Sequence, residues 1–233
     1  MAGDISRANA LRLASGVFGD WRKPESPLST VPAAKQLSQL GRVIVVNRPG
    51  SGQAGVAVAH FSPSRDNADY YQGIVANGVL GGSYSSRLNE EVRIRRGLSY
   101  GAFSHLFAGK KGGLWSAVIQ TKNISASEVA TLTFEEFSKL AAIAPSEQEL
   151  AARKATIVGS YARSFETTQG VAARTAALVF FGFDLSEIKR YIPTVQAVTV
   201  KQVTEYVRKN LYSSPTYMAI VGDSKQFDFN LKK

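Results

Sequence analysis

LGGSYSSRLNEEVRIRRGLSYGAF, residues 80–103, is the stretch of this 233-residue sequence that decides its fold. Small and hydroxyl-bearing residues lead into a charged segment, residues 86–96, which is typical of a surface helix, and Gly97 is a residue type that ends helices. The residues that follow, 98–108, are typical of a strand. Arg93 is therefore expected near the end of a helix, with Tyr100 in the strand after it.

The other predicted strands also come in pairs around short turns. The segment GKKGG, residues 109–113, separates strand 98–108 from strand 114–121, and its glycines can adopt the positive φ of a hairpin turn. Such hairpins favour an α+β two-layer sandwich, a mostly antiparallel sheet with helices packed on one face. The remaining predicted elements are strands at 42–48, 54–62 and 216–221, and helices at 5–18 (N-cap Asp4), 67–80 (N-cap Asp66 or Asn67), 125 or 127 to 143, 146–165 (capping box Ser146 and Glu149), 169–181, 186–192 and 200–211.

The composition limits the possible functions. A chain of this length with 44% hydrophobic residues can form one large domain, or one domain with an appendage. The absence of cysteine excludes disulfides, thiolate metal ligands and a cysteine nucleophile. No apolar run approaches the roughly 20 residues that span a bilayer. The net charge of +10 favours an acidic partner, but the charges are scattered and nucleic acid is not the favoured one.

The sequence does not support either of two hydrolase patterns, a zinc site or a serine nucleophile. Zinc peptidases place two histidines at helical spacing beside a glutamate, whereas His60 and His105 lie far apart in predicted strands. Residues 97–101, GLSYG, match G-x-S-x-G, but a helix precedes them and a strand follows, the reverse of a nucleophile turn. We therefore expect no metal site and no serine nucleophile here.

Arg93 and Tyr100 are the candidate functional residues. A guanidinium and a phenol on adjoining elements can both donate hydrogen bonds to an extended peptide or to a developing oxyanion. The residues alone leave a second interpretation open, in which Arg93 pairs with Glu90 on the helix surface and Tyr100 is a half-buried strand aromatic.

A series of short motifs runs through residues 3–223 in a characteristic order. They are GD at 3–4, FGDW at 18–21, NRPG at 47–50, DYY at 69–71, LGG at 80–82, SSRL at 85–88, Arg93, RGLSY at 96–100, EQEL at 147–150, Lys154 and VGD at 221–223. With these motifs the chain resembles the pitrilysin, insulysin and mitochondrial processing peptidase superfamily of inverzincin zinc metallopeptidases. It is most similar to the C-terminal, non-zinc domain of bacterial two-domain members.

The resemblance implies a metallopeptidase-like fold of the LuxS and processing-peptidase type, and a function. This chain would be the non-catalytic, substrate-binding half of a zinc peptidase, with no activity of its own. Arg93 and Tyr100 would bind the peptide main chain near the scissile bond. Zinc would be bound by a homologous partner domain or subunit that carries His-x-x-Glu-His, in a homo- or heterodimer. The alternative is a structural or scaffold subunit of a multiprotein assembly, without a proteolytic role.

The same resemblance suggests a domain organisation. The Gly-Asp pair at residues 3–4 repeats the one at 222–223, which follows the last predicted strand. Residues 1–18 are therefore expected to be the trailing helix of a missing upstream domain, 19–41 a linker, and 42–233 the non-zinc peptidase-like domain. The family favours a bacterial periplasm or cell envelope, with the cytoplasm as the other compartment.

Overall fold

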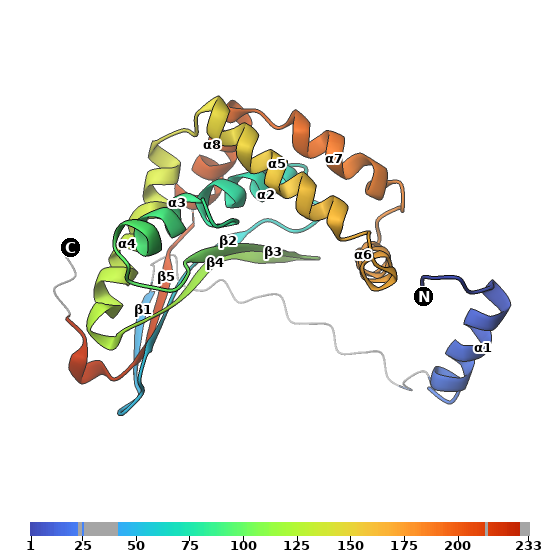
Figure 1. The fold of residues 1–233 in the computed structure, drawn as a ribbon, viewed down its shortest axis with the longest axis horizontal. Helices are drawn as coiled ribbons and strands as arrows, with labels where there is room; N and C mark the ends of the chain where they lie inside the picture. Colours follow the sequence, from blue (N-terminus) through green and yellow to red (C-terminus); the bar gives the residue numbers. More distant parts are fainter. Residues whose placement is uncertain (23–24, 26–41, 213, 229–233) are drawn as a thin grey trace.

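The computed structural model describes residues 1–22, 25, 42–212 and 214–228. Within these residues, five strands form one sheet in the order β1-β5-β2-β4-β3, and helices cover one of its faces (Figure 1). β5 runs parallel to β1, and the other neighbouring strands are antiparallel. The predicted α+β class is confirmed. The strands are β1 (Arg42–Asn47), β2 (Ala54–Ser62), β3 (Phe103–Gly109), β4 (Gly112–Thr121) and β5 (Tyr217–Gly222).

α2 and α4 pack on the sheet and α8 packs on both of them, while α5 and α7 lie on the outer side of α2 (Figure 1). α1 stands apart from this body, and none of its residues is buried. The helices are α1 (Arg7–Phe18), α2 (Tyr70–Leu80), α3 (Arg87–Asn89), α4 (Ala126–Ala142), α5 (Glu147–Arg163), α6 (Thr168–Phe181), α7 (Glu187–Ala197) and α8 (Val200–Val207), with π-helical turns at Glu90–Arg95 and Arg208–Tyr212 and 3₁₀ turns at Asn123–Ser125 and Ser224–Gln226.

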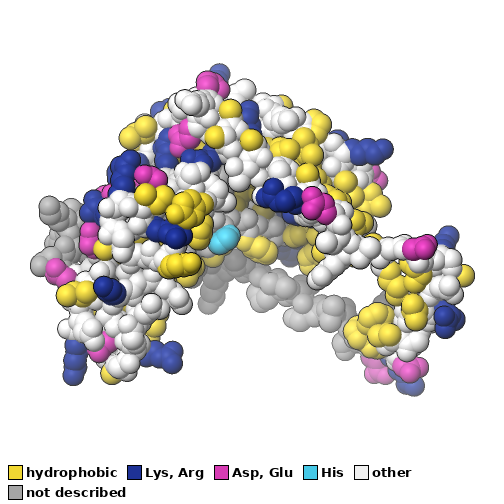
Figure 2. All heavy atoms as spheres, viewed as in Figure 1, with side chains coloured by type: hydrophobic (Ala, Val, Ile, Leu, Met, Phe, Trp, Pro, Cys, Tyr) yellow, Lys and Arg dark blue, Asp and Glu magenta, His cyan; other side chains and the backbone are white. Residues whose placement is uncertain are grey.

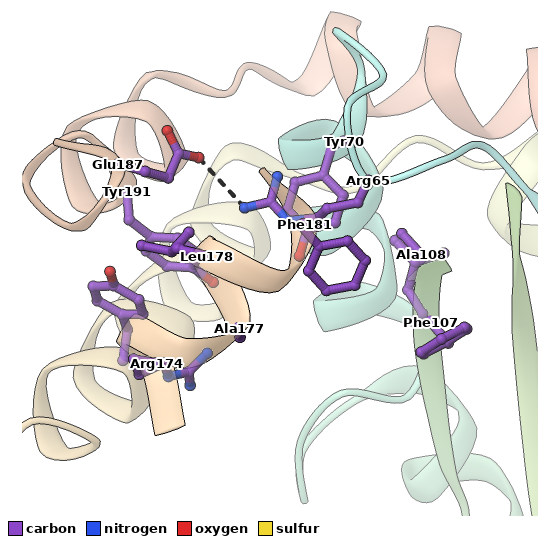
Figure 3. Close-up of a pocket in the computed structure, with 12 residues that line it drawn as sticks. Arg65, Tyr70, Phe107, Ala108, Arg174, Ala177, Leu178, Phe181, Glu187 and Tyr191 are labelled. Carbon is purple, nitrogen blue, oxygen red and sulfur yellow. Dashed lines mark hydrogen bonds and ion pairs between the residues drawn. The ribbon is translucent and has the colours of Figure 1, made fainter. Parts of the chain in front are cut away.

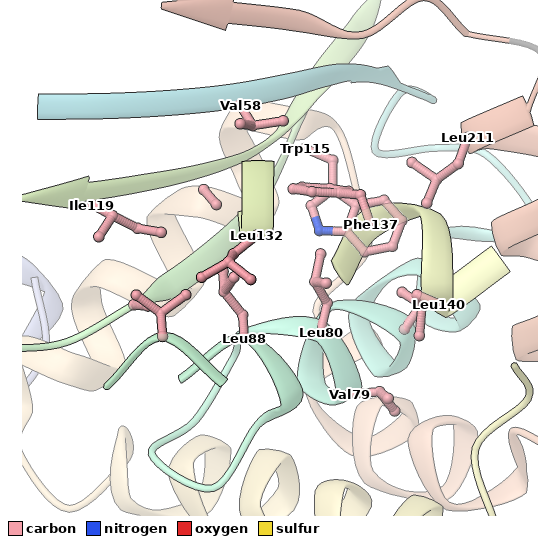
Figure 4. Close-up of a cluster of buried hydrophobic side chains, with 14 of the residues drawn as sticks. Val58, Val79, Leu80, Leu88, Trp115, Ile119, Leu132, Phe137, Leu140 and Leu211 are labelled. Carbon is pink, nitrogen blue, oxygen red and sulfur yellow. The ribbon is translucent and has the colours of Figure 1, made fainter. Parts of the chain in front are cut away.

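The core lies between the sheet and the helices (Figure 4). Trp115 of β4 is fully buried there and packs edge-to-face on Phe137 of α4, with ring centres 5.6 Å apart. The indole N–H of Trp115 donates to Asn77 Oδ1 at 2.9 Å, and Ser104 Oγ donates to the same oxygen at 2.8 Å. One side chain of α2 thus satisfies polar groups from two strands, which fixes the helix on the sheet.

The opposite face of the sheet carries exposed apolar side chains. Because alternate residues of a strand point to opposite faces, the residues between the core positions of β3 and β4 face outward. Phe107 is 65% exposed and Val118 is 62% exposed. A contiguous apolar face of this kind is typical of an interaction surface. Its largest members are Phe61, Phe103, Phe107, Leu114, Val118 and Val221.

The starts of two predicted helices differ from the structure. The N-cap of α1 is Ser6 rather than Asp4, because the Ser6 hydroxyl accepts from the backbone N–H of Asn9 at 3.2 Å. α2 begins at Tyr70, because the Asn67 side chain accepts from the N–H of Asp69 and closes a turn before the helix. The predicted linker, 19–41, lies largely outside the described residues.

The predicted capping box of α5 is only half formed. Ser146 Oγ accepts from the N–H of Glu149, as expected for an N-cap. The Glu149 carboxylate does not reach back to the cap. It instead forms a bidentate ion pair with Arg87, at 2.9 Å and 2.7 Å, and so connects α5 to α3. A tertiary contact has replaced the local one, because the guanidinium offers two charge-assisted bonds.

The segment that carries Tyr100 is not a strand, contrary to the prediction. β3 starts at Phe103, and the residues before it bond to side chains rather than to a sheet neighbour. Thr121 Oγ1 donates to the carbonyl of Leu98, and the N–H of Ala102 donates to Asn89 Oδ1. Residues 98–102 are therefore a connection whose position is fixed by its polar contacts.

Candidate functional site

The π-helical turn and Gly97 together reverse the chain after Arg93. The carbonyls of Val92 and Arg93 accept from the N–H groups of Leu98 and Gly97, both at 3.0 Å. Gly97 adopts φ +64°, a left-handed conformation that costs glycine little. The chain then returns along the helix end, and the Arg93 guanidinium carbon lies 4.7 Å from the ring centre of Tyr100.

The Arg93 guanidinium contacts a second ring, that of Tyr84, whose centre is 4.8 Å away. Both tyrosines are exposed, Tyr100 at 91% and Tyr84 at 56%. Two cation–π contacts hold a guanidinium in place without occupying its N–H groups. The sequence predicted Arg93 and Tyr100 as neighbours, and the structure brings them together. Tyr84 was missed, because it lies in a loop with no motif of its own.

Arg93 differs in its pairing from the other arginines of its cluster. Arg96 bonds Glu91 at 2.9 Å and Glu128 at 3.0 Å, and the bond from Arg96 lowers the pKa of Glu91. Glu90 forms its ion pair with Arg95, at 3.6 Å. The alternative that the sequence left open, a pair between Arg93 and Glu90, is therefore not formed. Within the described part of the chain no carboxylate pairs with Arg93. Its donors therefore remain available to a ligand.

Asn89 supports this arrangement from inside the domain. Its side chain is fully buried, donates to the carbonyl of Tyr84 at 2.6 Å and accepts from the N–H of Ala102 at 2.9 Å. It thus joins the two segments that carry the tyrosines. Sequence reasoning missed Asn89, and the available signal was a short amide next to Leu88 on the buried side of a predicted helix.

The chain's other candidate catalytic groups do not form a hydrolytic site. The Ser99 hydroxyl donates to the carbonyls of Gly101 and Gln120, which gives it a role in fixing the connection. His60 is buried against Phe137, and burial lowers its pKa to about 4. His105 is exposed on β3. Among the described residues, no three His, Cys, Asp or Glu side chains gather as a metal site would require, so these residues do not fit a zinc ion.

The fold and the site define an α+β domain whose described residues contain an exposed Arg–Tyr cluster and no group of three metal-ligand side chains. The family model described as the peptidase M16 inactive domain matches residues 1–157. The chain therefore belongs to this inactive-domain family.

Individual relatives agree with this assignment. An uncharacterized zinc protease of Streptomyces coelicolor is 23% identical over 228 residues, which are 96% of this chain and 49% of that protein. A Helicobacter pylori protein named non-peptidase homolog YmxG is 24% identical over 148 residues, 64% of this chain and 34% of that protein. The crystal structure of a peptidase M16 inactive domain from Pseudomonas fluorescens superposes with a TM-score of 0.76 at 26% identity, covering 94% of this chain and 52% of that one. The chain thus spans about half or less of the length of these relatives.

Two further observations concern the charges on the surface and the length of the helices. On the face shown in Figure 2, Lys and Arg side chains are dispersed among apolar and acidic ones and do not merge into one basic patch. No helix in the described ranges combines the length and the apolar character that a membrane crossing requires.

Proposed function

We propose that this chain is the substrate-binding half of a zinc metallopeptidase, and that Arg93 and Tyr100 hold the peptide main chain for a partner that cleaves it. The observation that carries the proposal is the Arg93 guanidinium, held between two exposed tyrosine rings without a carboxylate partner in the described residues. Membership of the inactive-domain family supports it.

The geometry suits an extended peptide. β3 is the last strand of the sheet in the described residues, so its outer edge can accept a further strand. Tyr100 lies three residues before β3, and Arg93 contacts its ring. A peptide added along β3 would therefore run past both donors. The guanidinium and the hydroxyl would bind peptide carbonyls, which become better acceptors as they polarise.

The partner would supply the chemistry that this chain lacks. A zinc ion bound by His-x-x-Glu-His would activate the attacking water in that partner. This chain's own contribution is to bind and orient the peptide, which lowers the barrier by positioning.

The test uses the complex of this chain with its zinc-binding partner. Arg93→Lys and Tyr100→Phe each remove hydrogen-bond donors but keep a cation or a ring. We expect kcat/KM for a quenched peptide to fall on the order of tenfold or more in each variant. Arg95→Lys is the matched control, since Arg95 is exposed and pairs with Glu90 and Glu91. If both variants cleaved as fast as the parent complex, the cluster would have only a packing role.

A scaffold subunit without a proteolytic role is the second candidate. The uncovered apolar face of the sheet favours it, because such a face fits a stable protein interface. One relative also has the name of a non-peptidase homologue. Purification of the native assembly separates the two functions. A subunit with His-x-x-Glu-His should be present if the chain binds substrate for a peptidase, and absent if the chain is a scaffold subunit.

A further inference from the structure

A pocket of about 250 Å³ lies beside the end of β3, well separated along that strand from the Arg93 cluster. Figure 3 shows Phe107 and Ala108 of β3 on one side and residues of α6 on the other. The volume is below the roughly 300–1,000 Å³ of sites for drug-sized molecules, so it fits one large amino-acid side chain. The residues that line it are Arg65, Tyr70, Leu106, Phe107, Ala108, Tyr161, Arg174, Ala177, Leu178, Phe181, Glu187 and Tyr191.

One face of α6 forms a wall of this pocket. Arg174, Ala177, Leu178 and Phe181 follow the three- and four-residue spacing that places side chains on the same side of a helix (Figure 3). The rings of Tyr161 and Tyr191 also line the pocket, and they stack at 3.8 Å with 8° between their planes. The interior is therefore mainly aromatic and aliphatic.

The acid in the pocket is already neutralised. Glu187, 8% exposed, accepts from Arg65 at 3.4 Å, from Arg190 at 3.2 Å and from the hydroxyl of Tyr71. Arg65 is fixed in turn by the Tyr70 ring, 3.8 Å below its guanidinium carbon. The charges of Glu187 and Arg65 therefore compensate each other without a ligand.

Arg174 is the lining cation that no carboxylate neutralises within the described residues. Its Nε donates to Ser164 Oγ at 3.0 Å, and its guanidinium carbon lies 5.2 Å from the Tyr161 ring centre. The guanidinium ends are thus held at the pocket with donors to spare. The phenol of Tyr191, whose pKa burial raises to about 12, also lines the pocket.

We propose that this pocket binds an aromatic residue that carries a free carboxylate, with the ring between α6 and the end of β3 and the carboxylate on Arg174. Two sources share this chemistry, the carboxyl-terminal residue of a peptide and a free aromatic amino-acid derivative. The position of the pocket favours the peptide, because β3 leads into it and a strand added along β3 would end there. The site goes beyond the proposed function, since Arg93 and Tyr100 do not take part in it.

Calorimetry on the full chain tests the proposal with three probes. They are an N-acetylated hexapeptide ending in phenylalanine, its C-terminal amide, and N-acetylphenylalanine. Six residues in a strand cover about 20 Å, close to the length of β3. The acid should bind about tenfold more tightly than the amide, because the amide lacks the charge-assisted bond to Arg174. Equal affinity of the acid and the amide would overturn the proposal.

Substitutions locate the binding. Arg174→Gln should abolish the preference for the acid, whereas Arg163→Gln, an equal loss of charge on an exposed arginine of α5 outside the pocket, should retain it. Ala177→Trp, at an exposed position of α6, should fill the pocket and remove binding of every probe. Preference retained in Arg174→Gln, or binding retained in Ala177→Trp, would refute the site.

Two further comparisons are needed. One distinguishes a peptide terminus from a free amino-acid derivative, and the other distinguishes this pocket from the Arg93 cluster. Hexapeptide binding that is stronger than N-acetylphenylalanine binding supports a peptide terminus, and equal binding assigns the same pocket to a free amino-acid derivative. The preference for the acid over the amide should persist in Arg93→Lys, because both peptides would pass Arg93 alike, whereas kcat/KM of the complex reports on the Arg93 cluster. This site and the Arg93 cluster can therefore fail independently.

Discussion

The buried side chain of Asn89 accepts a hydrogen bond of 2.9 Å from the backbone N–H of Ala102, the last residue before β3. Its amide also donates to the carbonyl of Tyr84. A single side chain from the helix thus determines where the two tyrosine-bearing segments lie, and Arg93 then occupies the space between their rings.

Asn89→Ala should therefore affect both stability and the site. It leaves the buried N–H of Ala102 without its partner, at a cost of about 1–3 kcal/mol, and also removes the bond to the part-buried carbonyl of Tyr84. Urea denaturation measures the loss. Asn9→Ala on the exposed α1 is the control and should change stability by less than about 0.5 kcal/mol. A variant as stable as the parent would show that water or rearrangement replaces both bonds.

The purified 233-residue chain should not hydrolyse peptides, with or without added zinc. Its described residues offer no cluster of three metal ligands, and Ser99 of the G-x-S-x-G match bonds backbone carbonyls. The measurement is fluorescence release from a quenched peptide library, with a chelator-treated sample as the blank. Zinc-dependent turnover that co-elutes with the chain would contradict the proposed division of labour.

Glu187→Gln should destabilise the junction of α2 and α7. The carboxylate pairs with Arg65, and both side chains are nearly buried, at 11% and 12% exposure. Loss of the charge leaves the Arg65 guanidinium poorly compensated, and about 3 kcal/mol of unfolding free energy should be lost. Glu205→Gln removes an exposed pair with Lys201 at 3.9 Å and should cost less than about 1 kcal/mol. Similar losses in the two variants would contradict the assigned role.

Acid should destabilise the domain through His60. Burial lowers its pKa from 6.5 to about 4, so the folded chain binds fewer protons than the unfolded chain between these values. Stability therefore rises with pH across this window, is fully present above about pH 6.5, and falls by up to about 3 kcal/mol as pH drops to 4.

His60→Leu should flatten this part of the stability curve, which denaturation at pH 7, 5.5 and 4 would reveal. The leucine keeps an apolar contact with Phe137, which His60 now touches with ring centres 5.0 Å apart. An unchanged slope in the variant would assign the acid sensitivity to other groups.

The fold was predictable where local patterns and tertiary structure agree. β2 occupies Ala54–Ser62 as predicted, because small residues and turns bound an apolar run that fits a central strand. The hairpin of β3 and β4 formed at its glycines for the same reason. The prediction failed where distant side chains form the contacts: Thr121 donates to the carbonyl of Leu98, and Arg87 pairs with the carboxylate of Glu149.

The site was predictable in part. Gly97 was predicted to end the helix and to put Arg93 and Tyr100 on adjoining elements, and the two side chains do lie together, although Tyr100 is in a connection rather than a strand. Tyr84 could not be inferred, because its place depends on a buried amide five residues later in the chain that bonds its carbonyl. The pocket beside the end of β3 could not be predicted either, because residues of four helices, a loop and a strand end form it together.

The π-helical turn at Glu90–Arg95 makes the Arg93 cluster depend on the number of residues as well as on their identity. A π turn holds more residues than an α turn, and each residue of an α-helix advances the chain by about 100° around the axis. Deletion of one residue from this turn would let an ordinary α-helix form and swing the guanidinium about a quarter of a turn away from the tyrosines. A family member could thus retain every side chain of the cluster and lose its geometry through a single codon.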